Sequence, residues 1–169
     1  MAVFHLGNFM AYTFLQDLGD VKAFYGNGRD HFNSLAGQVT RLPIETALQD
    51  QVVQQVSQRS ASFGCLLRRA IPVMLCSAWE SFVDELKVTD ITRYQTHFVM
   101  YGLWHSEPVR EIALIRHCIT HSKNKIDAEY LRKSKLKTFN TLGTLIDFSD
   151  PDLDLQFKTF EDAYNNITS

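Results

Sequence analysis

The clearest hydrophobic pattern in the chain is a stripe of apolar residues in the segment from about Ile44 to Thr89. In its second half the apolar positions recur every three or four residues, as in a helix that packs one face into a bundle. Pro72 lies within this stripe, so we expect a kink, or a break one turn earlier near Gly64. The stripe contains Leu67, Ile71, Met74, Ala78, Phe82 and Leu86.

A weaker helical pattern precedes this segment, from roughly Asn8 to Val39. Glycine is costly inside a helix, so we expect a break near Tyr25-Gly-Asn-Gly. Leu42-Pro43 then predicts a turn. The glycines that interrupt the pattern are Gly19, Gly26 and Gly28.

Shorter helical segments follow. A connector with a helical fragment, from Arg93 to Trp104, leads into a third helix. Ser106 is its predicted N-cap, and Pro108 is tolerated in its first turn. Another short helix is expected from its cap at Asp127 through Lys137.

The C-terminal part predicts a turn at Ser149-Asp-Pro-Asp and a short amphipathic helix from Leu155. Thr141 to Phe148 would also fit a strand, but a single strand has no partner in this chain. The sequence therefore predicts an all-α bundle of four to five helices with a long kinked central helix. One face of the last helix carries Phe157, Phe160 and Tyr164.

Composition narrows the class of protein. A chain of 169 residues is long enough for one domain with a proper core, so residues 1–169 are expected to form a single domain. With 45% apolar and 21% charged residues it is of globular type, and its net charge of -2 restricts any nucleic-acid binding to a local patch. Cys65, Cys76 and Cys118 fall within helical patterns and are expected as buried, reduced side chains.

The apolar N-terminus has no lysine or arginine, so it lacks the basic region of a signal peptide. His5 and Asn8 also interrupt its apolar run. No uninterrupted apolar run approaches the ~20 residues that span a bilayer. We therefore expect a soluble, cytoplasmic protein that does not associate with a membrane.

The candidate chemistry is concentrated in the third helix, between Ile115 and Lys125. At about 100° per residue, Ile112, Ile115, Cys118 and Ile119 fall on one arc that faces the core, and Arg116, His117, Thr120 and His121 fall on the opposite arc. A guanidinium is always charged and an imidazole titrates near neutrality. Together they are the two groups needed to break a phosphodiester without a metal ion.

The order of Arg116, the polar His117, three spacers and His121 resembles the signature of HEPN domains. These are all-α proteins, many of which are RNA-cutting toxins or abortive-infection factors. The stretch Ser77-Ala-Trp-Glu80 also looks like a helix common in one branch of the family. The resemblance covers roughly Leu66 to Lys125 and implies a HEPN-like bundle, a homodimer whose two motifs face a shared cleft, and an accompanying antitoxin or nucleotidyltransferase.

The resemblance implies a metal-independent endoribonuclease in a toxin or in phage or stress defence. His121 would act as general base on the ribose 2′-hydroxyl, giving a 2′,3′-cyclic phosphate and a 5′-hydroxyl. Arg116 would stabilise charge on the phosphoryl oxygens. The acid for the leaving oxygen is either His117 or a histidine of another subunit. His117 stands where the family often has asparagine or aspartate, so it is either a second acid/base or a structural substitute.

Other residues are expected to support this site. Glu80 lies in an apolar stripe, where a buried carboxylate needs a partner. It either bonds to Arg116 or His121 and orients that side chain, or it points to solvent. Thr120 lies on the polar arc of the motif, and Asn124 follows it in a segment suited to lining a pocket.

A run with six basic residues, from Lys123 to Lys137, follows the motif. It would supply phosphate contacts to RNA, or it is only a solvated face. His117 and His121 also have the spacing of a metal-binding pair, but no third ligand stands out, so we expect neither a metal nor a cofactor. The candidate RNA-binding residues are Lys123, Lys125, Arg132 and Lys133.

Two other functions stay open. A non-catalytic HEPN-like module would bind a partner protein or a nucleotide, with Arg116 and His121 held in intrachain salt bridges away from any cleft. A structural helical protein would leave His117 and His121 in bulk solvent without a neighbouring arginine. Trp79, Trp104 and Phe98 are candidates for a dimer interface.

Overall fold

The computed structural model describes residues 7–39, 46–99 and 102–169. Within these ranges every regular element is a helix, so the predicted all-α class is confirmed. The described residues form six α-helices, where four to five were predicted. The elements are α1 (Gly7–Val39), α2 (Thr46–Thr89), α3 (Ile91–Phe98), the 3₁₀ helix η1 (Gly102–Trp104), α4 (Glu107–His121), α5 (Ala128–Lys133) and α6 (Asp150–Thr168).

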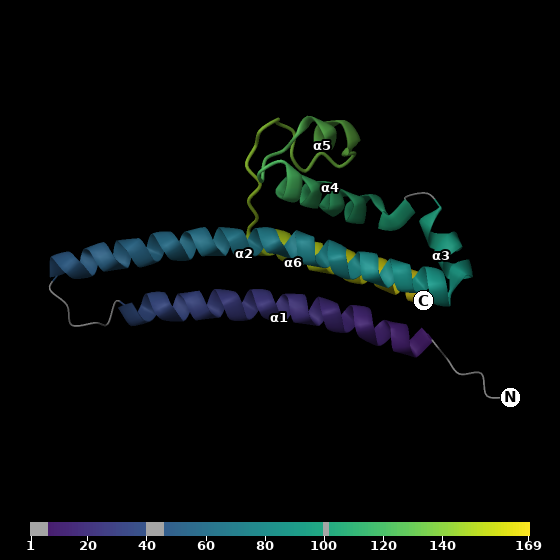
Figure 1. Cartoon of the computed structure of the whole chain (residues 1–169), viewed down its shortest axis with the longest axis horizontal. Helices are drawn as coiled ribbons and strands as arrows, with labels where there is room; N and C mark the ends of the chain where they lie inside the picture. Colours follow the sequence, from purple (N-terminus) through teal and green to yellow (C-terminus); the bar gives the residue numbers. More distant parts are fainter. Residues whose placement is uncertain (1–6, 40–45, 100–101) are drawn as a thin grey trace.

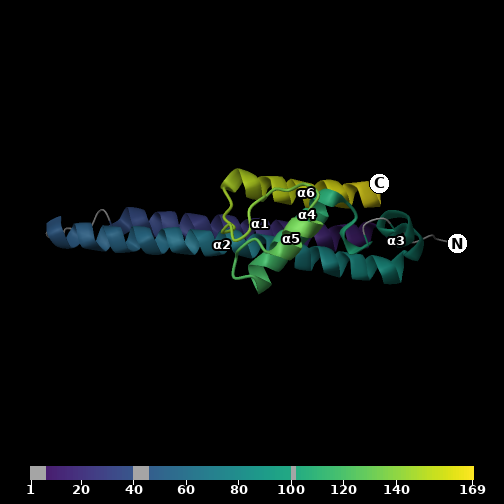
Figure 2. The same ribbon diagram turned by 90° about the horizontal axis from the view of Figure 1, so that it is seen from above.

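Two long helices form the base of the molecule. Figure 1 shows α1 and α2 running antiparallel as a hairpin whose far end extends beyond the other helices. Seen from above in Figure 2, α6 runs along one side of this hairpin, and α4 and α5 cross over it at an angle. The helix that carries the motif, α4, is thereby placed on one face of α2.

The core is organised around Trp79, which is 0% exposed. Its ring lies 5.6 Å from Phe14 of α1 and 5.5 Å from Phe160 of α6, measured between ring centroids. Its indole Nε1 donates a hydrogen bond of 2.9 Å to the carbonyl of Leu103 in η1. One side chain therefore joins α1, α2, α6 and the connector that precedes α4.

The first two helices differ from prediction in being unbroken. The expected interruption near Tyr25-Gly-Asn-Gly is wrong, since α1 continues through it. Gly28 faces α2 so closely that a Cβ there would lie 2.9 Å from Cδ2 of Leu67. The missing side chain thus lets α1 and α2 pack closely, and that packing offsets the weak helix propensity of glycine.

Helix α2 also continues through Gly64 and Pro72, so the expected break near Gly64 is wrong. Figure 1 shows a gentle curve along it instead. Proline inside a helix costs roughly 3 kcal/mol. Burial of neighbouring apolar residues such as Ile71 and Leu75, each contributing about 1.5–3 kcal/mol, offsets this cost.

Helix α5 begins where it was predicted to begin and ends earlier than predicted. Asp127 caps α5 by accepting a hydrogen bond of 2.7 Å from the Tyr130 N–H, but α5 ends at Lys133 and not at Lys137. The backbone leaves the helix there because Ser134 is extended and its hydroxyl bonds to Glu111.

The last helix begins earlier than predicted. Ser149 and Asp152 form a capping box at the position of the expected turn. Helix α6 therefore begins at Asp150 and not at Leu155. The segment Thr141 to Phe148 forms no strand; the described part of the chain has a single isolated bridge between Lys125 and Leu145.

By length and composition alone, the part of α2 from Asp50 to Thr89 is apolar enough to cross a membrane. This was not expected, because the segment contains no long uninterrupted apolar run. Ile71, Leu75 and Trp79 are nevertheless buried inside the protein. The core helix of a soluble bundle meets the same test, so this composition is weak evidence for a membrane.

Replacing Trp79 with alanine is expected to lower the free energy of unfolding by about 3–5 kcal/mol, because it opens a cavity between three helices. The loss also leaves the Leu103 carbonyl without its donor. Urea unfolding followed by circular dichroism measures the effect. Phe24→Ala, at a 48% exposed aromatic residue of α1, is the control and should change stability by no more than about 0.5 kcal/mol. Equal effects of the two variants would contradict the central position of Trp79.

Candidate functional site

Helix α4 presents the motif on the side that faces away from the core. It begins after its N-cap Ser106, as predicted, with Pro108 in the first turn. Ile112, Ile115 and Cys118 are buried against the rest of the bundle. The opposite arc is polar and accessible, with Arg116 and His117 half-buried, and Thr120 and His121 exposed.

Arg116 is held between an acid and an aromatic ring. Its Nη2 donates a hydrogen bond of 3.0 Å to Oε1 of Glu80, and its Nη1 lies 3.5 Å from Oε2 of the same carboxylate. The guanidinium carbon is 5.6 Å from the centroid of the Trp104 ring. Of the alternatives left open for Glu80, the structure therefore shows the contact with Arg116. Both side chains are part-buried, so the pair restricts where the guanidinium can point.

The two histidines lie next to one another, with ring centroids 4.8 Å apart. His117 also faces Glu129 of α5, with 3.8 Å between Nε2 and Oε2. Glu129 accepts a hydrogen bond of 2.5 Å from Lys133, and this bond holds the pKa of Glu129 below its usual value. His117 thus has a carboxylate on one side and a second imidazole on the other.

A cleft of about 260 Å³ opens at this place, between α4, α5 and η1. Arg116 and His117 line it together with Lys133, one of the predicted RNA-binding residues. His121 is not among its lining residues and lies beside it, on the His117 ring. The remaining walls are formed by Trp104, Arg110, Ala113, Leu114, Glu129 and Tyr130.

Two of the predicted supporting residues, Thr120 and Asn124, take part in hydrogen bonds to the backbone near the end of α4. The Thr120 hydroxyl donates to the carbonyls of Arg116 and His117 at 3.0 and 3.2 Å, so it is bonded within its own helix. Asn124 has φ 61°, and its carbonyl accepts a hydrogen bond of 2.8 Å from the Ile146 N–H. Both residues shape the end of α4.

The other basic candidates lie outside the cleft. Lys123 and Lys125 are exposed in the turn after α4, beyond His121, and Arg132 is exposed at the end of α5. The structure therefore brings Lys133 to the cleft and spreads the other three over the adjoining surface.

Two carboxylates, Asp127 and Glu111, accept hydrogen bonds from the segment between Ser122 and Ser134, which lies behind the cleft. Asp127 accepts hydrogen bonds from Ser122 Oγ at 2.5 Å and from the Tyr130 N–H. Burial raises the pKa of Asp127, but these hydrogen bonds outweigh it and leave the pKa below its usual value. Glu111, which is buried, accepts hydrogen bonds from the Tyr130 hydroxyl and from Ser134 Oγ. Burial raises the pKa of Tyr130 to about 12, so the phenol stays a donor.

Six residues of this cleft were not among the predicted site residues: Trp104, Arg110, Ala113, Leu114, Glu129 and Tyr130. Glu129 was detectable, because it stands four residues before Lys133 on a helix, the spacing of an ion pair. Trp104 and Tyr130 reach the cleft only through the path of the connectors on either side of α4, for which the sequence gives no local signal.

Two of the three candidates for a dimer interface lie inside the protein. Trp79 and Phe98 are buried in the core of their own chain, so neither serves a dimer interface; Trp104 remains half-exposed. Among the described residues, no three His, Cys, Asp or Glu side chains are grouped so that they would hold a metal ion.

Compared with protein-family models, with curated proteins and with solved structures, the chain shows no match. The HEPN resemblance therefore rests on the residues of this chain alone.

The pair formed by Glu80 and Arg116 is expected to couple by about 1 kcal/mol in a double-mutant cycle of Glu80→Gln and Arg116→Met, because both groups are partly removed from water. Chemical unfolding of the four proteins gives the coupling energy. The exposed pair Asp84 and Lys87, also on α2, is the control and should couple by less than about 0.5 kcal/mol. A coupling no larger than in the control would mean that Glu80 does not hold Arg116.

Proposed function

We propose that this protein is a metal-independent endoribonuclease of HEPN type, which cleaves RNA to 2′,3′-cyclic phosphate and 5′-hydroxyl ends. The observation that carries the proposal is that Arg116, held by Glu80, lines an accessible cleft together with His117, and that His121 lies against the His117 ring. A fixed cation and two imidazoles within reach of one phosphodiester are the groups that this reaction requires.

In the proposed reaction His121 takes the proton of the ribose 2′-hydroxyl, and the 2′-oxygen attacks the adjacent phosphorus. The bond from phosphorus to the 5′-oxygen breaks, and an acid protonates that oxygen. Arg116 neutralises the charge that develops on the non-bridging oxygens. The proton gained by the base and the proton given by the acid balance, so no metal ion or redox partner enters the step.

His117 is the nearest candidate for the acid, because its ring lies 4.8 Å from that of His121. Glu129 borders the His117 ring as well, with 3.8 Å between its Oε2 and the imidazole Nε2. Lys133 in the cleft and the exposed Lys123, Lys125 and Arg132 would bind neighbouring phosphates without reading sequence. A histidine from a second subunit is the other source of the acid, and we propose a homodimer on the strength of the resemblance.

The second candidate is a non-catalytic module that binds a partner protein or a nucleotide. One observation favours it: the guanidinium of Arg116 already has a carboxylate partner, so a phosphate would have to compete with Glu80. A role in the cytoplasm as a toxin or defence factor, together with an antitoxin or a nucleotidyltransferase, belongs to the same proposal and depends on the resemblance.

Cleavage of a mixed RNA pool in excess EDTA tests the proposal. The wild-type protein is expected to cut, and its products should carry cyclic-phosphate ends. Arg116→Ala should lower the rate by about 10²–10³, the effect of losing one group that stabilises transition-state charge. His121→Ala should lower it by about 10²–10⁴, the usual contribution of general acid–base catalysis.

The matched controls are Arg93→Ala on α3 and His31→Ala on α1, which change the same residue types away from the cleft and should keep wild-type rates. His117→Asn separates the two sources of the acid: a large loss assigns the acid to His117, and near-normal cleavage assigns it to another histidine. Products with 5′-phosphate ends would contradict the mechanism. A folded wild-type protein that binds RNA or a partner without cutting would favour the binding module.

A further inference from the structure

A second cavity lies on the other side of α4 from the motif. It has a volume of about 330 Å³, is open to solvent on one side and is lined by α4, the segment between α5 and α6, and the first turns of α6. This size is at the lower end of the range for small-molecule sites. It shares no lining residue with the cleft at Arg116 and His117.

Most of its wall is apolar. Ile112 and Ile115 of α4 and Phe148 form buried parts of it, while Leu136 and Leu155 are exposed at 52% and 66%. Water is retained in a cavity by polar partners and gains little from apolar walls. The exposed leucines therefore favour an occupant with an apolar body.

One polar atom in this wall, the amide oxygen of Gln156, has no hydrogen-bond partner among the described residues. Gln156 of α6 is only 7% exposed, and its Oε1 makes no hydrogen bond within the described part of the chain. A buried polar atom without a partner costs free energy, so native proteins keep few of them. Gln156 is one of the residues that line the cavity, and a rotation of its amide would turn the covered Oε1 toward a donor on a bound molecule.

The charged groups of the wall are all acidic. Glu111, Asp147 and Asp152 line the cavity, and no lysine, arginine or histidine is among its described lining residues. Glu111 accepts hydrogen bonds from Tyr130, Ser134 and the Thr138 N–H, which leaves room for about one more donor on its two oxygens.

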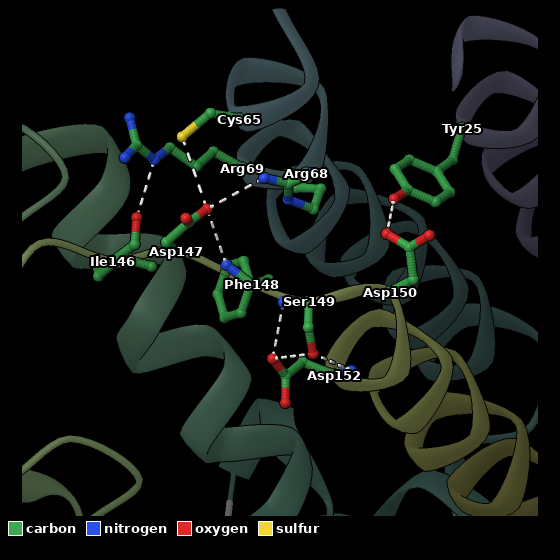
Figure 3. A network of polar contacts seen from close by, with 10 residues as sticks. All are labelled: Tyr25, Cys65, Arg68, Arg69, Ile146, Asp147, Phe148, Ser149, Asp150 and Asp152. Carbon is green, nitrogen blue, oxygen red and sulfur yellow. Dashed lines mark hydrogen bonds and ion pairs between the residues drawn. The ribbon is translucent and has the colours of Figure 1, made fainter. Parts of the chain in front are cut away.

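Figure 3 shows two arginines of α2 against the segment that carries Asp147. Arg69 Nε donates a hydrogen bond of 2.8 Å to the Ile146 carbonyl, and Arg68 Nη2 lies 3.6 Å from Asp147. Asp152 uses one oxygen, Oδ2, in the capping box with Ser149. Arg68 thus offsets part of the charge of Asp147, while Asp152 keeps its other oxygen for a ligand.

From these observations we infer that the cavity between α4 and α6 binds a small organic cation, an amine with an apolar body. The apolar part would lie against Ile112, Phe148 and Leu155. Its ammonium group would donate hydrogen bonds to the Gln156 amide and to the carboxylates of Asp152 and Glu111. An anionic molecule of the same shape would be rejected, since the cavity offers it no cation.

Three probes of one shape and different charge test this inference on the full chain: phenethylamine, phenethyl alcohol and hydrocinnamate. Isothermal titration and amide chemical shifts in NMR spectra measure binding. The amine is expected to bind best and the acid least, and the amide signals that move should be those of residues around the cavity, such as Thr138, Phe139 and Gln156. The signals of Arg116 and His121 should stay in place.

Two variants and a control sharpen the test. Gln156→Leu should weaken amine binding roughly tenfold, the size of one lost hydrogen bond, and melt at or above the wild-type temperature because it removes an unpaired buried atom. Asp152→Asn should weaken binding several-fold, and Asp154→Asn, an equal charge change on α6 outside the cavity, should not. Equal binding of amine and acid, unchanged affinity of Gln156→Leu, or no binding of any probe would overturn the inference. If phenethyl alcohol binds as tightly as phenethylamine, the inference is also overturned. That result would favour an apolar side chain of a partner protein as the occupant.

Discussion

The burial of Trp79 is the constraint on which the rest of the structure depends. Its ring is in contact range of aromatic rings from α1, α3 and α6, and its N–H fixes η1, the connector that leads into α4. Glu80 is the next residue in the chain. Because the tryptophan faces the core, the carboxylate beside it is turned toward α4, where it meets Arg116. The geometry of the proposed active site therefore follows from the packing of one indole.

Helix α4 serves two separate cavities. Arg116 and His117 line one of them, while Glu111, Ile112 and Ile115 line the other. Tyr130 stands between the two, since its ring borders the first cavity and its hydroxyl bonds to Glu111 in the second.

Sequence patterns predicted what depends on local periodicity. The apolar stripe of α2 and the buried face of α4 lie where their spacing placed them. The same spacing indicated that Glu80 needs a partner if it is buried, but it left open whether the carboxylate bonds to Arg116 or His121 or points to solvent. The continuity of α1 was not predictable, because Gly28 is explained only by Leu67 on another helix.

The same reasoning that found Glu80 would have found Gln156 and Glu111. Both are polar residues at positions of their helices where the neighbouring spacing is apolar, and both are buried. Trp104 and Tyr130 could not be assigned in this way, because the path of a connector or a short helix is decided by tertiary contacts. Local pattern thus locates buried polar groups well, and it identifies their partners poorly.

The central claim is that Arg116, His117 and His121 use a ribose 2′-hydroxyl as the nucleophile. The most direct test is a set of DNA oligonucleotides, each with a single ribonucleotide of one base, incubated with the wild-type protein in EDTA. The account predicts one cut, directly 3′ to the ribonucleotide, with a cyclic phosphate on the upstream product, and no cut in the all-DNA strand. Cutting at deoxyribonucleotides, or cutting that requires a divalent metal ion, would contradict it.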